Sequence, residues 1–275
     1  MPGQLIDVNG HRVHLYCTGD GAPTVVVAGG SFSFDWALVQ PQVARFTRIC
    51  TYDPTGVAWS DPLPADTIPT CADRINELHA LLSTAAIKSP YVLVGFSIGG
   101  LIARLYEARY PTEVSGLVIV DHAFIDTGAR SKQPEQPKFE GADTPPVPIY
   151  TPPVSLDIED EDNFRKLPRI DQERHRWALS IGSFRPTSET AAHCFQEVAA
   201  AQPNTPYPLG QKPLAVVSTL YDSARYRDLQ NQLLALSRDS KQYVAANSTH
   251  MVDIDEPEII VAAIKDVVDR VRAKR

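Results

Sequence analysis

The sequence predicts an α/β fold, with a mainly parallel β-sheet covered by helices on both faces and a helical insertion late in the chain. Short apolar runs rich in β-branched residues, such as TVVVAGG at residues 24–30, alternate with segments that have helical spacing. Alternation of this kind is typical of parallel sheets built from strand–helix–strand units. Prolines then cluster between residues 122 and 212, after which the strand–helix rhythm resumes.

The first half of the chain supplies most of the predicted strands. Residues 4–8 and 11–17 alternate apolar and polar side chains and are separated by Asn9-Gly10, a strong hairpin signal. Later strands are apolar throughout, as expected of strands that are buried on both faces. The elements predicted after the hairpin are strands at 24–30, 46–53, 91–96 and 115–121, a helix at 71–85, and a helix directly after Ser97.

The second half divides into an insertion and the end of the sheet. Residues 122–212 are polar and helical between their prolines, and so long an insertion between two strands cannot join the sheet. We therefore expect a core of residues 1–121 and 213–275, with 122–212 as a helical cap. Ligands of such sheets bind beyond the carboxyl ends of the strands, the edge that the cap would cover. The remaining predicted elements are strands at 213–222 and 241–246 and helices at 228–237 and 256–271.

The composition and net charge of the chain limit the kinds of molecule that we expect it to bind. The chain has 275 residues, of which 43% are hydrophobic and 21% charged, as is ordinary for a globular protein that can bury a large core. The formal net charge of −7 and the isoelectric point near 5.5 argue against nucleic acid or an anionic membrane as a partner. A small-molecule substrate is the expected partner, and a homodimer stays open.

The cysteines and the first residues of the chain bear on its location. Cys17, Cys50, Cys71 and Cys194 are widely scattered, and no CxxC pair suggests zinc or redox chemistry. We expect reduced, mostly buried thiols, although Cys17 and Cys50 could meet if their strands are neighbours. Residues 1–17 lack a basic-then-apolar signal segment, and no apolar stretch reaches about 18 residues. These features predict a cytoplasmic protein.

The segment Gly95-Phe96-Ser97-Ile98-Gly99 fits the G-x-S-x-G pattern of a serine nucleophile, with a predicted strand before it and a helix after it. A sharp strand-to-helix turn forces Ser97 into a strained backbone conformation and leaves no room for flanking side chains. The turn also places the hydroxyl at a helix amino terminus, where the backbone N–H of Ile98 can receive an oxyanion. The plainer alternative is a glycine-rich turn that only packs a helix tightly on a strand.

A serine nucleophile needs a base, an acid and a second oxyanion donor. His250 is our candidate base, because it lies between the last predicted strand and the last helix, on the active edge. Asp222 is the preferred acid, since the order Ser97, Asp222, His250 is the order expected of this architecture. Asp121 also ends a predicted strand and is the alternative acid. The AGGSFS segment supplies the second donor, for which we favour Gly30.

These motifs resemble the α/β-hydrolase superfamily over nearly the whole chain. Its esterase-like members carry a YDRxGxGxSD loop, and this chain has YDPTGVAWSDP at residues 52–62. The resemblance implies an eight-stranded, mostly parallel sheet with strand two antiparallel, and a cap inserted between strands six and seven. It implies neither cofactor nor metal. The site residues that it implies are Ser97, His250 and Asp222 as the triad, with Ile98 and Gly30 as the oxyanion hole.

Three departures from the family pattern lie near the expected pocket. Family members usually carry His-Gly before the oxyanion loop, where this chain has Ala28-Gly29. They commonly carry histidine before the nucleophile, where this chain has Phe96, and arginine after the aspartate of the loop, where it has Pro54. None of these changes touches the triad. They put the family's usual substrate preferences in doubt rather than its chemistry.

The predicted activity is hydrolysis of small to medium carboxylic esters through a Ser-His-Asp acyl-enzyme mechanism. A serine at the elbow excludes the dehalogenase and epoxide-hydrolase branch, which needs an aspartate nucleophile. Aromatic residues of the cap, such as Phe164 and Trp177, would supply apolar walls or pack the cap itself. The alternatives on the same fold are lactone hydrolysis, aminopeptidase action, hydrolysis of a carbon–carbon bond and cofactor-free perhydrolysis. The alternative from a different class is a receptor that keeps the hydrolase frame but only binds a ligand.

Overall fold

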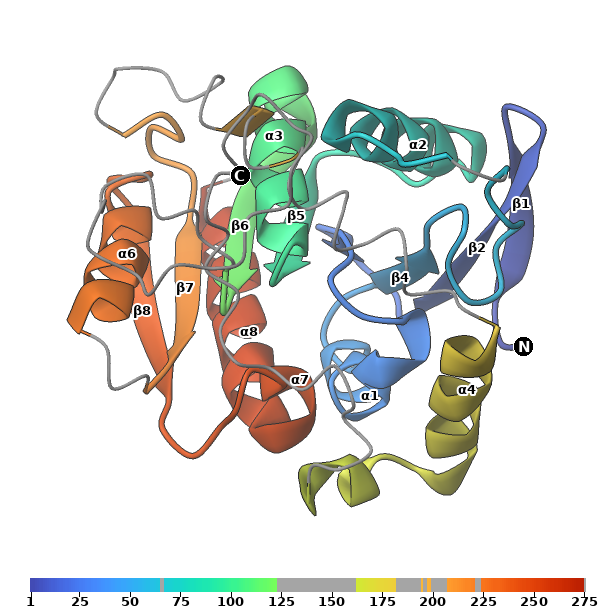
Figure 1. The fold of residues 1–275 in the computed structure, drawn as a ribbon. Coiled ribbons are helices and arrows are strands. Elements are labelled where there is room, and N and C mark those ends of the chain that lie inside the picture. The colour runs from blue at the N-terminus through green and yellow to red at the C-terminus, as the bar shows by residue number, and fades with distance from the viewer. Residues whose placement is uncertain are drawn as a thin grey trace, which may run out of the picture.

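A computed structural model describes residues 1–64, 67–122, 162–181, 194, 197–198, 207–220 and 224–274. Eight strands form one sheet in the order β1-β2-β4-β3-β5-β6-β7-β8 (Figure 1). β2 is antiparallel to both of its neighbours, and every later pair is parallel, which confirms the predicted sheet. The strands are β1 (Gln4–Val8), β2 (His11–Thr18), β3 (Val25–Val27), β4 (Ile49–Asp53), β5 (Tyr91–Phe96), β6 (Val114–Val120), β7 (Leu214–Thr219) and β8 (Ser240–Ala245).

Helices follow most of the strands, as the alternating pattern indicates. The predicted helices at 71–85, after Ser97, at 228–237 and at 256–271 correspond to α2, α3, α6 and α8, with shifted ends. Short elements after β3 and β8 were not predicted, because they are too brief to show a hydrophobic period. The helices are η1 (Ser33–Leu38, a 3-10 helix), α1 (Gln40–Val43), α2 (Cys71–Thr84), α3 (Gly99–Arg109), η2 (Pro111–Glu113), η4 (Asp162–Lys166), α4 (Arg169–Ser180), α6 (Ala224–Leu234), α7 (Val252–Asp255) and α8 (Pro257–Ala273).

The sheet is buried on both faces because successive side chains of a strand point to opposite sides. In β3, Val26 belongs to an apolar cluster with residues of α2 and α3, whereas Val25 and Val27 belong to a second cluster with η1, α1 and α8. In β5, Leu93 and Val94 divide between the two clusters in the same way. The continuous apolar runs in the sequence therefore reflect two cores, one on each side of the sheet.

The described part of the insertion contacts the core near the loop that follows β3. α4 packs against η1, and Ala178 of α4 joins a small apolar cluster with Phe32, Phe34, Val57 and Ala58. Most of residues 122–212 lies outside the described residues, so the division into core and cap stays a prediction.

The cysteines correct the sequence-based expectation of reduced thiols. Cys17 and Cys50 lie directly opposite each other in the antiparallel β2–β4 ladder, with their Cα atoms 4.0 Å apart, and form a disulfide. Cys71, at the start of α2, forms a second disulfide with Cys194 of the insertion. The expectation was wrong because strand register and the docking of the insertion, neither visible in the spacing, bring these pairs together.

The disulfides also bear on the predicted location. Disulfide bonds persist in oxidising compartments and are rare in the cytosol. The cytoplasmic location stays a prediction, and the two disulfides argue against it. Within the residues that the structure describes, no helix combines the length and apolar character needed to span a bilayer.

Removing the disulfide between Cys71 and Cys194 should lower the free energy of unfolding by about 2–4 kcal/mol, because it closes a long loop in the unfolded chain. Urea denaturation of a Cys71→Ala, Cys194→Ala double variant measures the change. Thiol titration of the unreduced, denatured wild type serves as the control and should find no free thiol. Four free thiols in freshly purified, unreduced protein would contradict both disulfides.

Candidate active site

Ser97 occupies a strained turn between β5 and α3. Its backbone φ is 51°, in the left-handed region that side-chain-bearing residues rarely adopt. The turn is fixed because the N–H of Ser97 donates to the carbonyl of Val120 at the end of β6, over 2.9 Å. Ile98 forms the amino-terminal cap of α3, so its backbone lies at the helix amino terminus. This is the geometry that the G-x-S-x-G pattern predicts.

Close backbone packing explains the glycines on either side of Ser97. A Cβ atom at Gly95 would lie 2.6 Å from the Cα of Gly100 and would overlap the carbonyl of Gly99. A Cβ atom at Gly99 would overlap the carbonyl of Gly29 in the loop after β3. The first turn of α3 therefore approaches both β5 and this loop at backbone-to-backbone distance.

Gly95→Ala should accordingly destabilise the fold by several kcal/mol, because backbone atoms on a strand and a helix cannot yield to the added methyl group. Thermal unfolding followed by circular dichroism measures the effect as a large drop in Tm or loss of the folded protein. Gly10→Ala is a useful comparison, since nothing lies within 4 Å of a Cβ there and only its positive φ opposes the change. A Gly95→Ala variant as stable as the wild type would contradict this packing.

The loop after β3 runs beside the nucleophile turn. Gly30 has a φ of 112°, and a Cβ atom there would overlap the carbonyl of Phe96, the residue before Ser97. The loop is held by Asp53 at the end of β4, which accepts hydrogen bonds at 2.9 Å from both the N–H and the hydroxyl of Ser33. The structure thus places Gly30, the candidate oxyanion donor, against the residue that precedes Ser97.

His250 pairs with a buried carboxylate. Its Nδ1 lies 2.6 Å from Oδ2 of Asp121, directly after β6, and the Asp121 side chain is 1% exposed. The ring of His250 also packs on that of Phe96, with centroids 4.9 Å apart. The preferred acid, Asp222, lies outside the described residues, whereas the alternative acid, Asp121, contacts the candidate base.

Hydrogen bonds fix the loop between β8 and α7 that carries His250. Oδ2 of Asp255 accepts hydrogen bonds from the N–H of Thr249 at 2.7 Å and from its hydroxyl at 2.6 Å. The N–H of Asn247 donates to Glu256 over 2.6 Å. These contacts tie the histidine loop to α7 and to the start of α8.

The sequence of this chain matches a known protein family. A family model described as the alpha/beta hydrolase fold matches residues 23–272, nearly the whole chain. The chain belongs to the α/β-hydrolase family.

Individual relatives of this α/β-hydrolase are distant or only partly aligned. An uncharacterized protein of Schizosaccharomyces pombe is 31% identical over 159 residues, which cover 46% of this chain and 29% of that protein. This chain thus spans less than a third of the length of that relative.

Solved structures agree on the fold and differ in activity. A thermophilic esterase from Thermogutta terrifontis has a TM-score of 0.66 at 19% identity, covering 98% of each chain. An epoxide hydrolase mutant from Vigna radiata has a TM-score of 0.70 at 15% identity, covering 97% of this chain and 98% of that one. At such identities the likeness shows the fold alone.

Two hydroxyl groups that the sequence analysis missed complete the surroundings of Asp121 in this α/β-hydrolase. Oδ1 of Asp121 accepts hydrogen bonds from Thr219 at 3.0 Å and from the hydroxyl of Tyr226. Thr219 could have been found as the last residue of the strand next to β6, whereas Tyr226 comes from α6 and leaves no sequence signal. Both oxygens of the carboxylate are therefore fixed.

A second buried histidine–carboxylate pair was also missed. Nδ1 of His175, on α4, lies 2.9 Å from Oδ1 of Asp35, whose Oδ2 accepts the N–H of Phe32 at 3.1 Å. Burial raises the pKa of the Asp35 carboxyl, and the hydrogen bond with His175 opposes that rise. The pair joins the insertion to the loop that carries Gly30, across a separation of 140 residues that hides it in the sequence.

Two of the cap aromatics expected to line the pocket or to pack the cap lie in different surroundings. Phe164 is buried and its ring lies edge-on to that of His175, with centroids 5.4 Å apart. Trp177 is 38% exposed and stacks on Trp59 at 6.0 Å. Across the described part of the chain, no three His, Cys, Asp or Glu side chains are grouped so that they could hold a metal ion.

Proposed function

We propose that this α/β-hydrolase cleaves small to medium carboxylic esters through a covalent intermediate on Ser97. The observation that carries the proposal is the 2.6 Å contact between His250 and the buried Asp121, on the edge of the sheet that also holds the strained turn of Ser97. A serine hydroxyl is a weak nucleophile until a neighbouring base takes its proton. A histidine held by a buried carboxylate is suited to that role.

In this mechanism Ser97 Oγ attacks the ester carbonyl carbon while Nε2 of His250 takes the hydroxyl proton. Asp121 accepts a hydrogen bond from the Nδ1–H of His250, fixes the tautomer and stabilises the imidazolium that forms. The backbone N–H groups of Ile98 and Gly30 receive the tetrahedral oxyanion. His250 then gives its proton to the departing alcohol, and water releases the acid from Ser97 by the same steps.

We assign the acid to Asp121 rather than to Asp222. The carboxylate of Asp121 has one oxygen on His250, and its other oxygen accepts hydrogen bonds from Thr219 and Tyr226. Because both oxygens are engaged, the carboxylate keeps a single orientation and can direct the imidazole ring.

The preference for esters with a modest apolar acyl group rests on the surroundings of the turn. Phe96 replaces the polar residue usual before the nucleophile, and its ring packs on His250. The nearby loop carries Phe32 and Phe34, which stack with their centroids 5.1 Å apart. Apolar rings beside the turn favour an uncharged acyl chain over the ammonium group of an amino-acid amide. Such rings carry no carboxylate that could form an ion pair with the ammonium group.

Turnover of p-nitrophenyl acetate and butyrate, together with labelling by a fluorophosphonate probe, tests the proposal. We expect hydrolysis well above the buffer rate, and peptide mass mapping should place one probe adduct on Ser97. A panel of lactones and amino-acid amides measures the competing activities. An absence of turnover on every ester, combined with no adduct at Ser97, would leave a ligand-binding protein on a hydrolase frame.

A further inference from the structure

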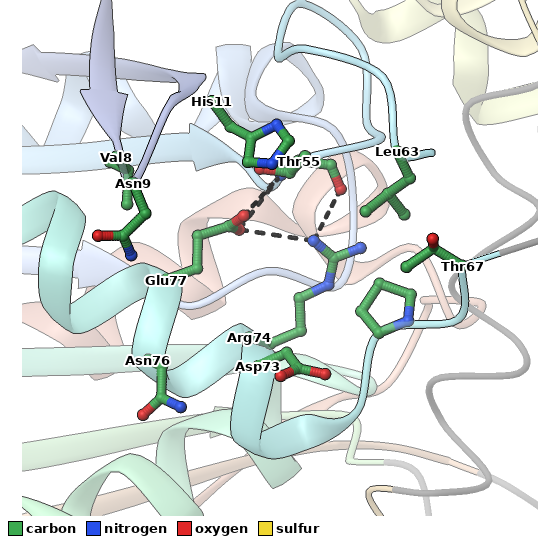
Figure 2. A pocket seen from close by; sticks show the side chains of 11 residues that line it. Val8, Asn9, His11, Thr55, Leu63, Thr67, Asp73, Arg74, Asn76 and Glu77 are labelled. Carbon is green, nitrogen blue, oxygen red and sulfur yellow. Dashed lines mark hydrogen bonds and ion pairs between the residues drawn. The ribbon is translucent and has the colours of Figure 1, made fainter. Parts of the chain in front are cut away.

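A second cavity lies away from the proposed catalytic residues. Its volume is about 400 Å³, and its walls are the turn between β1 and β2, the loop after β4, and the first turns of α2 (Figure 2). None of Ser97, Asp121 and His250 lines it. Apolar side chains of Val8 and Leu63 share its surface with polar side chains from α2.

Arg74 brings a buried cation to this cavity. Its side chain is only 5% exposed, and its Nη1 donates to the carbonyl of Thr55 at 2.8 Å and faces Glu77 at 3.5 Å. Its other terminal nitrogen, Nη2, is buried and has no hydrogen-bond partner among the residues that the structure describes. Figure 2 shows Nη2 directed away from Thr55 and Glu77, toward Leu63 and Thr67. A buried donor without an acceptor is destabilising, and in native proteins it often marks a site where something binds.

The carboxylates near Arg74 already have donors. Both oxygens of Glu77 accept the N–H of Thr55 at 3.2 Å, and Asp73 accepts the N–H and the hydroxyl of Thr70 at 2.9 and 2.7 Å. Among the described residues that line this cavity, the buried polar atom without a partner therefore belongs to a cationic donor, and an ionised oxygen acceptor forms the strongest hydrogen bond to it.

We propose that this cavity binds a short-chain aliphatic monocarboxylate, with its carboxylate on Nη2 of Arg74 and its alkyl chain against Val8. Nη2 lies beneath the cavity surface, so the half-buried side chain of Leu63 turns aside as the ligand enters. The charges of Asp73 and Glu77 repel a second negative charge, which selects a monoanion over a dicarboxylate or phosphate.

Titration of 4,4,4-trifluorobutyrate, followed by the width of its ¹⁹F NMR signal, tests the site. We expect saturable binding to the wild type, and the same affinity for Ser97→Ala, since the proposal does not depend on ester hydrolysis. Arg74→Met should weaken binding about tenfold or more, because a charge-assisted hydrogen bond is lost. Arg169→Gln is the matched control that removes an exposed arginine elsewhere and should bind as the wild type does.

Two further variants keep the test independent of folding defects at Arg74. Asn76→Trp fills the cavity from its exposed rim and should abolish binding, whereas Leu63→Ala uncovers Nη2 and should tighten binding several-fold. Butyrate should displace the probe more effectively than succinate or inorganic phosphate. No saturable binding to the wild type, or equal affinities of wild type, Arg74→Met and Asn76→Trp, would overturn the proposal.

Discussion

Ser97→Ala is expected to lower kcat for p-nitrophenyl butyrate by about 10⁶-fold, to a residual rate that rests on the oxyanion donors and on substrate binding. Without the hydroxyl no acyl-enzyme can form, and the histidine and the oxyanion donors have no nucleophile to assist. The fold should be preserved, because removing one oxygen from a half-buried turn leaves the backbone contacts of the elbow intact. Stopped-flow and long-time assays together cover the range of rates.

The matched control for this variant is Ser83→Ala, which removes an exposed hydroxyl from the last turn of α2. It should hydrolyse the ester at the wild-type rate. Circular dichroism should give the same spectrum for both variants. If Ser97→Ala kept more than a few per cent of the wild-type kcat, another group would have to be the nucleophile and the proposed mechanism would fail.

Asp121→Asn should lower kcat about 10⁴-fold at neutral pH while leaving the Tm nearly unchanged. The asparagine has the shape of the aspartate, so it can keep the contacts with Thr219 and Tyr226. It cannot stabilise an imidazolium, and its amide favours the wrong tautomer of His250. Since the imidazolium forms only as the reaction proceeds, KM should change little and the loss should fall on kcat.

Asp222→Asn separates the two candidate acids. If Asp121 orients His250, as its 2.6 Å contact supports, the Asp222→Asn variant should keep most of its activity. A 10⁴-fold loss in Asp222→Asn together with near-normal activity in Asp121→Asn would show that Asp222 is the acid. Measurement of kcat and KM for both variants on one ester distinguishes the two results.

Local features made much of the fold predictable. The runs that became β3 and β5 are apolar at every position, because both faces of these strands are buried. The hairpin at Asn9-Gly10 and the turn at Ser97 were equally visible. Their sequences satisfy steric demands of a few neighbouring residues, and such demands leave a compact signature.

The choice of acid shows where sequence patterns stop. Asp121 and Asp222 each end a predicted strand, and β6 and β7 are parallel neighbours in the sheet, so the sequence predicts both carboxylates at the same edge. Chain order favoured Asp222, whereas the contact with His250 involves Asp121. Neighbouring strands differ in position by only about 5 Å, and no sequence period encodes which strand end lies beside the imidazole.

The sequence by itself determined the alternating α/β architecture, the position of the strained serine and the need for glycine around it. The tertiary structure decided between alternatives that the sequence left open, namely the contact of His250 with Asp121 and the disulfide of Cys17 with Cys50. It alone revealed the buried pair of His175 and Asp35, the disulfide of Cys71 with Cys194, and the Arg74 nitrogen that has no partner among the described residues. The physical reason is the separation in sequence over which each interaction acts. Backbone strain and strand burial act among adjacent residues, whereas the contact between His250 and Asp121 spans 129 residues and exists only once the strands are ordered in the sheet.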